Sequence, residues 1–88
     1  MFITKQDNKM SKLNSLAISE NGFIFKPSTG ESFTTNEIGL LIINFLKQGK
    51  TADEIINEIT KEFDVDAISA GRDLYEYLDS LKREKMLD

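Results

Sequence analysis

The chain has 88 residues, contains no Cys and no His, and carries a formal net charge of −4. This length suits one small domain with a modest hydrophobic core. Without Cys or His the chain has no disulfide, no thiol or imidazole nucleophile and no ligand for soft metals, so we expect that it binds no metal or cofactor.

Charge is distributed unevenly along the chain. Residues 1–35 carry four Lys against three acidic groups, whereas residues 36–88 carry seven basic against twelve acidic groups. Nucleic-acid-binding domains normally present a basic face, so we expect no nucleic-acid partner. No stretch approaches the roughly 20 apolar residues that span a bilayer, and the first five residues turn polar too early for a secretion signal. We therefore expect a cytoplasmic protein without a membrane partner.

Turn signals divide the first third of the chain into three short strands. Residues 1–12, MFITKQDNKMSK, show no periodicity, and we expect a mobile N-terminal arm, with an extra edge strand as the alternative. Apolar runs at 13–18 and 23–26 flank a segment ending in Asn-Gly, which favours a tight hairpin. A Pro-containing turn at 27–30 precedes a third strand at 31–34, whose inward residue is Phe33.

Two capping-box patterns mark the starts of helices, Thr-Thr-Asn-Glu at 34–37 and Thr-Ala-Asp-Glu at 51–54. The first helix ends near Gly49 and is apolar nearly all round, which is typical of a central helix. On its far side Leu40 and Ile43 are expected to contact the sheet or the arm, with a dimer partner as the alternative. The second helix has one apolar stripe, at Ile55, Ile56, Ile59 and Phe63.

A third helix is predicted from a cap at Asp66 to about Lys85. At 100° per residue its core stripe contains Ala70, Leu74, Tyr77, Leu78 and Leu81. One flank of this stripe is apolar and small, and consists of Ile68, Gly71, Tyr75 and Lys82. The other flank is charged, and consists of Asp73, Glu76, Ser80 and Glu84. Across all three helices we expect these residues to be buried: Ile38, Leu41, Ile42, Phe45, Ile55, Ile59, Phe63, Leu74, Leu78 and Leu81.

The order and spacing of three segments resemble the PqqD-like family, named for the pyrroloquinoline quinone synthesis protein. These segments are TGESFTTNEIGLLIINFL, GKTADEIINEITKEFDVD and DLYEYLDSLKREKML. The most specific matches are Asn-Glu-x-Gly at 36–39, Thr-x-x-Glu-Ile at 51–55 and Phe-Asp-Val-Asp at 63–66. The chain departs from the family at Thr35, where an aliphatic residue is usual, and just before the final Leu, where Gly is common and this chain has Lys85-Met86-Leu87.

The resemblance implies an α+β, winged-helix-like fold, with a three-stranded antiparallel sheet followed by a three-helix bundle. It places a PqqD-like peptide-binding domain at residues 13–88, after the arm at 1–12. It also implies a peptide chaperone that is not an enzyme. Such a chaperone binds the leader segment of a ribosomally synthesised precursor peptide and presents it to a modifying enzyme such as a radical S-adenosylmethionine maturase. We expect a monomer or weak homodimer.

In that family the leader adds as a strand beside the third strand and lies against the third helix, so that backbone hydrogen bonds give affinity and side-chain pockets give specificity. The expected site combines the edge of the third strand with the small apolar flank of the third helix, where Gly71 would let a backbone approach closely and Tyr75 would both pack and hydrogen-bond. The expected peptide-binding residues are Glu31, Ser32, Phe33, Thr34, Thr35, Ile68, Gly71, Tyr75, Leu78 and Lys82.

Alternatives remain open at this stage. The same helices are compatible with a winged-helix DNA-binding regulator, although the acidic third helix is a poor match to phosphate. A structural dimerisation module is a further alternative. Ile68 and Tyr75 are alternatively ordinary packing or exposed residues, and Gly71 a tolerated helix glycine. The charged flank is expected to be solvated, with attraction of basic residues of a leader or an enzyme as the alternative.

Overall fold

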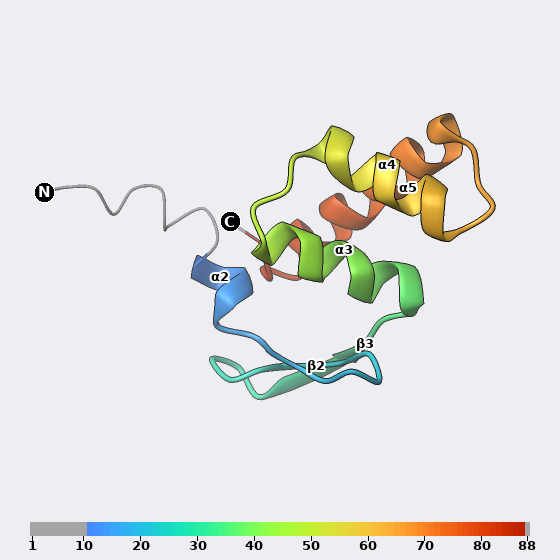
Figure 1. Cartoon of the computed structure of the whole chain (residues 1–88). Coiled ribbons are helices and arrows are strands. Elements are labelled where there is room, and N and C mark those ends of the chain that lie inside the picture. The colour runs from blue at the N-terminus through green and yellow to red at the C-terminus, as the bar shows by residue number, and fades with distance from the viewer. Residues whose placement is uncertain (1–10, 88) are drawn as a thin grey trace, which may run out of the picture.

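A computed structural model of the chain describes residues 11–87 and shows an α+β domain (Figure 1). A short helix and a three-stranded sheet precede three longer helices. The elements are α2 (Ser11–Asn14), β1 (Ala17–Ile18), β2 (Phe23–Lys26), β3 (Glu31–Thr34), α3 (Glu37–Lys47), α4 (Ala52–Glu62) and α5 (Ala67–Arg83). The predicted fold class is confirmed. Residues 1–10 of the predicted arm lie outside the described residues, and its last two residues belong to α2.

The sheet is antiparallel with the order β1-β2-β3, as predicted. Gly22 and Gly30 end the two connecting turns with φ angles of 90° and 80°, which favour glycine. The prediction that the first strand begins at residue 13 is wrong, because Leu13 lies in α2. Leu13 and Leu16 are both buried. Residues three apart share one face of a helical turn but lie on opposite faces of a strand, so the turn buries both leucines.

The structure has the predicted N-cap residue at the start of two of the three long helices. Thr51 and Glu54 form the predicted capping box, with N–H to oxygen distances of 2.8 and 3.2 Å. Asp66 caps α5 by accepting from the Ser69 N–H at 2.7 Å. The predicted box at residues 34–37 is wrong, because Asn36 caps α3 by accepting from the Gly39 N–H. Thr34 does not cap the helix because it is the last residue of β3, where it pairs with Phe23, and α3 begins only at Glu37.

The core lies on both sides of α3, which is sandwiched between the sheet and the α4–α5 pair (Figure 1). Ile43 is fully buried in one cluster with Ile24 of β2 and Leu13 of α2. This burial agrees with the expectation that Ile43 contacts the sheet. Five of the ten residues expected in the core are buried, namely Ile42, Ile55, Ile59, Leu74 and Leu81. The other five are partly buried and packed against the core, namely Ile38, Leu41, Phe45, Phe63 and Leu78.

Within residues 11–87, no helix combines the length and the apolar character needed to cross a membrane.

Candidate functional site

β3 is an edge strand of the three-stranded sheet, because β2 is its one neighbour there and its other side is unpaired. The Thr35 N–H donates to the Gly22 carbonyl at 2.8 Å, which extends the β2–β3 register by one bonded pair. Bonded and non-bonded pairs alternate in an antiparallel ladder, so the backbone groups of Phe33 face β2. Those of Ser32 and Thr34 therefore face away from β2. The free edge of β3 presents both N–H donors and carbonyl acceptors.

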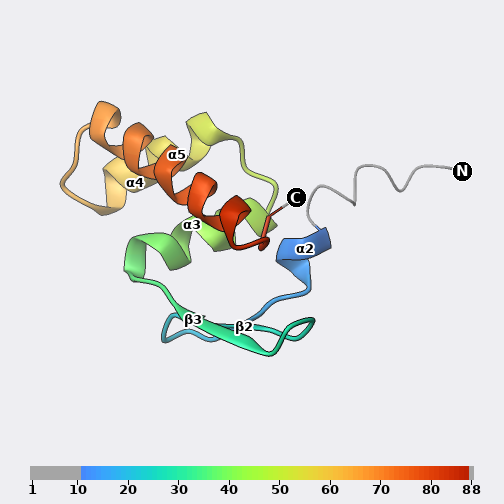
Figure 2. The same cartoon turned by 180° about the vertical axis from the view of Figure 1, so that it is seen from behind.

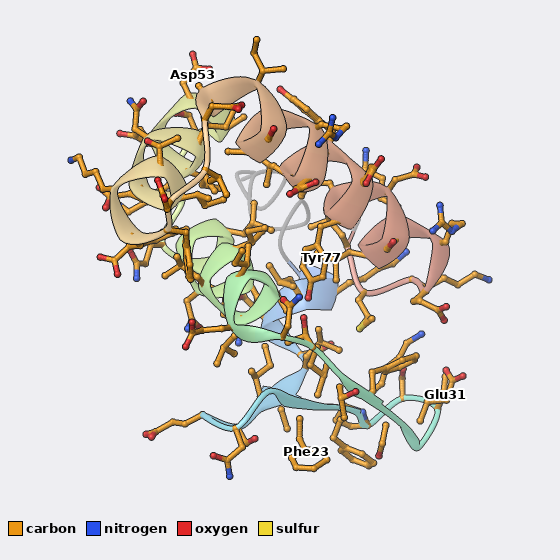
Figure 3. All side chains as sticks on the ribbon, turned by 90° about the vertical axis from the view of Figure 1, so that its right-hand side faces the viewer. Phe23, Glu31, Asp53 and Tyr77 are labelled. Atoms are coloured by element: carbon orange, nitrogen blue, oxygen red, sulfur yellow. The ribbon has the colours of Figure 1, made fainter. Side chains whose placement is uncertain are left out.

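The free edge of β3 and helix α5 lie on the same side of the molecule, as Figure 2 shows. A hydrogen bond of 2.7 Å joins the Thr35 hydroxyl, just after β3, to the Tyr77 hydroxyl on α5. Figure 3 shows Tyr77 between α5 and the sheet. Burial raises the pKa of Tyr77 above its usual value, and the hydrogen bond to Thr35 partly opposes this rise. Tyr77 thus links the strand to the helix.

Gly39 in the first turn of α3 makes room for this link. A Cβ atom at position 39 would overlap the Thr35 hydroxyl oxygen and would lie 2.8 Å from the Tyr77 hydroxyl oxygen. Real Cβ atoms essentially never approach other heavy atoms this closely. Glycine at this position therefore allows the end of β3, the start of α3 and the middle of α5 to meet.

A second link joins the sheet to the C-terminal end of α5. The buried Lys26 donates from Nζ to the main-chain carbonyl of Glu84 at 2.7 Å, and its Nζ lies 3.7 Å from a carboxylate oxygen of Glu31. A cation at a helix C-terminus is also favoured by the helix dipole. Because Lys26 pairs with Glu31 at the start of β3, the two links hold α5 at both ends of the strand.

A groove of about 280 Å³ lies between α3 and α5, and its first lining residue is Asn36, two residues after β3 ends. Ile38 and Ile42 of α3 give it an apolar floor, and Asp73 and Glu76 of α5 give it an acidic rim. Its complete lining is Asn36, Ile38, Gly39, Ile42, Asp73, Glu76, Tyr77 and Ser80. The Thr35–Tyr77 hydrogen bond joins the strand edge to the groove, and we call the edge and the groove together the β3–α5 cleft.

Residues 22–87 match the family described as coenzyme PQQ synthesis protein D (PqqD). The chain belongs to the PqqD family. This match confirms the resemblance that the sequence motifs indicate. No curated protein matches the chain.

Two solved structures share the fold of this PqqD-family chain. One is described as TbiB1 in complex with the TbiA(beta) leader peptide, with a TM-score of 0.74, 28% identity and coverage of 83% of this chain and 86% of that one. The other is described as lasso peptide synthetase B1 complexed with the leader peptide, with a TM-score of 0.71, 27% identity and coverage of 80% and 84%. Both structures contain a bound leader peptide.

The predicted helix flank lies on the other side of α5 from β3. Ile68 and Tyr75 are 84% and 59% exposed, so they are outside the core as the sequence indicates. A Cβ atom at Gly71 would lie 3.5 Å from the Ile56 side chain, which places this flank next to α4. At 100° per residue, Tyr75 and Tyr77 point about 160° apart. A Cβ atom at position 71 would therefore make only an ordinary contact with the Ile56 side chain of α4.

The structure thus brings together only part of the predicted site of this PqqD-family chain. Residues 31–35 line one side of the β3–α5 cleft, whereas Ile68, Gly71, Tyr75 and Lys82 follow the flank beside α4. Leu78 is partly buried against the core. Peptide binding at either surface stays a prediction.

Sequence reasoning missed the contact between Tyr77 of α5 and Thr35 at the end of β3. Tyr77 falls within the core stripe by periodicity. A buried tyrosine hydroxyl needs a hydrogen-bond partner, and this requirement is the signal that could have indicated a contact outside the helices. Asp73 and Glu76 are exposed, as expected for a solvated flank, and they line the groove together with Ser80. Sequence reasoning also missed the outer face of the sheet, where Phe23 and Phe25 are 58% and 43% exposed; Figure 3 shows Phe23 pointing away from the helices.

Across residues 11–87, no three Asp or Glu side chains gather closely enough to hold a metal ion.

Proposed function

We propose that this PqqD-family chain binds the leader segment of a ribosomally synthesised precursor peptide and presents the precursor to a modifying enzyme. The observation that carries the proposal is the free edge of β3, which lies next to a groove between α3 and α5 in a fold shared with two chains solved with leader peptides. The function is binding, and the chemistry belongs to the enzyme, for which a radical S-adenosylmethionine maturase is our first candidate. The proposal places the protein in the cytoplasm, where precursors are synthesised.

The leader adds as a fourth strand beside β3. The N–H and carbonyl groups of Ser32 and Thr34 then form hydrogen bonds that do not depend on the leader sequence, while the side chains that enter the β3–α5 cleft supply specificity. Three of the four strand positions of β3 are exposed, which leaves the edge accessible. The backbone groups that give affinity and the side chains that give specificity therefore lie next to each other.

The position of α5 relative to β3 is fixed by contacts within the chain. The Thr35–Tyr77 and Lys26–Glu84 hydrogen bonds fix the spacing between β3 and α5 before any peptide arrives. Ordering loops and side chains during binding reduces affinity, and a preformed site avoids much of this loss. The leader itself is the partner that becomes ordered.

The proposal is tested by titrating the ¹⁵N-labelled chain with synthetic peptides that tile the leader of the precursor encoded beside its gene. We expect amide shifts at residues 31–35 and around Tyr77. Shifts confined to α4 around Asn57 and Lys61, with β3 and α5 silent, contradict the proposal. Shifts centred on Ile68 and Tyr75 move the site to the flank beside α4.

A pair of variants at one position separates backbone pairing from side-chain contact. S32P removes a donor from the free edge without removing a β2–β3 bond, and proline is tolerated on edge strands. S32A keeps the backbone donor and removes only the hydroxyl. We expect S32P to weaken leader binding and S32A to bind as the native chain does, with both variants folded by circular dichroism. Equal affinity of S32P and S32A contradicts strand addition at β3.

A further inference from the structure

The groove at the end of the β3–α5 cleft has the chemistry of a site for one basic side chain. We infer that it takes the side chain of a Lys or Arg residue of the leader, located next to the segment that pairs with β3. This inference rests on the proposed function and adds a sequence requirement to it.

The lining of the groove suits a long side chain with a cationic end. Ile38 and Ile42 offer apolar surface for a methylene stem, and the carboxylates of Asp73 and Glu76 lie at the rim. Lys and Arg bury their stems along apolar surface while keeping the charged group near water and acidic partners. An uncharged aliphatic side chain would gain nothing from the exposed carboxylates, and an acidic one would be repelled.

The two carboxylates are available to such a ligand. The groove lining contains no basic residue. Asp73 lies 3.9 Å from its sequence neighbour Arg72, and both side chains are more than half exposed, so this pair is weak. In the described part of the chain Glu76 forms no salt bridge. A cation entering from the leader therefore replaces little existing pairing.

The groove volume sets the size of the occupant. Sites for small-molecule ligands typically enclose about 300–1,000 Å³. The groove, at about 280 Å³, falls just below this range and suits one long side chain.

The position of the groove fixes where the basic residue lies in the leader. Asn36 lines the groove and directly follows Thr35, whose hydroxyl is bonded to Tyr77 of the same lining. A peptide that pairs with Ser32 and Thr34 therefore passes the groove at the Thr34 end of β3. We expect one basic residue at a constant spacing from the pairing segment.

The inference is tested by selecting peptides from an mRNA-displayed library of random short sequences on the full chain. We expect the native chain to enrich peptides with Lys or Arg at one fixed position. D73N/E76Q should lose this preference while still selecting peptides that bind at β3, and D73K/E76K should enrich Asp or Glu there instead. E62K/D64K makes the same change in charge away from the groove and should select as the native chain does.

Affinities of one selected peptide quantify the contact. Changing its basic residue to Gln should weaken binding to the native chain by about three- to tenfold, as expected for a cation beside two exposed carboxylates, and should have less than about a twofold effect with D73N/E76Q. The native contact should also weaken at high salt. Amide shifts at residues 31–35 identify peptides bound at β3.

The outcomes separate the inference from the proposed function. Peptides that bind at β3 without any basic preference overturn the inference and leave the proposed function standing. The inference is also overturned if D73K/E76K keeps the native preference. If no selected peptide shifts the amides of β3, both the proposed function and the inference fail.

Discussion

Gly39 offers the sharpest test of how β3 and α5 are joined. In the variant G39A the new methyl group would overlap the Thr35 hydroxyl oxygen and would lie 2.9 Å from the Tyr77 ring carbon that bears the hydroxyl. Accommodation requires the Thr35–Tyr77 hydrogen bond to open or the Tyr77 ring to move. We therefore expect G39A to be destabilised, although alanine is the better helix former.

The change in the free energy of unfolding follows from two destabilising contributions and one stabilising contribution. Loss of one hydrogen bond costs about 0.5–1.5 kcal/mol, and overpacking costs about 1–3 kcal/mol. Replacing a helical glycine by alanine stabilises by up to about 1 kcal/mol. The net change is a loss of about 0.5–4.5 kcal/mol, and its middle is a substantial part of the roughly 4–13 kcal/mol expected for a domain of this size.

The assay is urea unfolding followed by circular dichroism, with G71A as the matched control. Position 71 is also a helical glycine, but its added Cβ meets Ile56 at an ordinary 3.5 Å. We expect G71A to equal or exceed the native free energy of unfolding, and both variants to keep the native dependence on urea concentration. The reasoning is refuted if G39A is as stable as the native chain, or if G71A loses as much as G39A.

Three further predictions concern charge and pH. Burial raises the pKa of Tyr77 in the folded chain, so its contribution to stability is complete below pH 10 or so and is lost as pH rises through the folded pKa; the native chain should lose more stability than Y77F in alkaline urea titrations. The Ser69 N–H bond lowers the pKa of Asp66, so below about pH 4 the native chain should lose stability relative to D66N, which keeps a capping oxygen without the titration. The acidic helical half predicts no shift of random DNA in a gel at low salt; a shift at the protein concentrations that bind leader would favour the DNA-binding alternative.

The sequence was sufficient for the fold wherever local signals agree with tertiary packing. Helix α4 combines a capping box with a clean apolar stripe, and both are present in the structure. The signal at Thr34 failed because Thr34 itself pairs with Phe23 in the sheet, which a local pattern does not reveal. Leu13 was assigned to a strand because a short apolar run does not distinguish strand from helix.

The candidate site was predictable only in part for a related reason. The free edge of β3 follows from the order of the strands, which the turn signals indicate. Which flank of α5 faces that edge depends on the rotation of the helix about its axis, and periodicity fixes the core stripe but not which neighbour lies beside each flank. The Tyr77–Thr35 bond, between residues 42 positions apart, settles this orientation.

Amide hydrogen exchange at β3 tests the central claim most directly. In the free chain the Phe33 and Thr35 N–H groups face β2, whereas those of Ser32 and Thr34 face solvent. Strand addition predicts that saturating leader peptide slows exchange specifically at Ser32 and Thr34, in this alternating pattern, because their N–H groups become hydrogen-bonded. Unchanged exchange at Ser32 and Thr34 with leader fully bound would contradict the claim that the peptide pairs with the edge of β3.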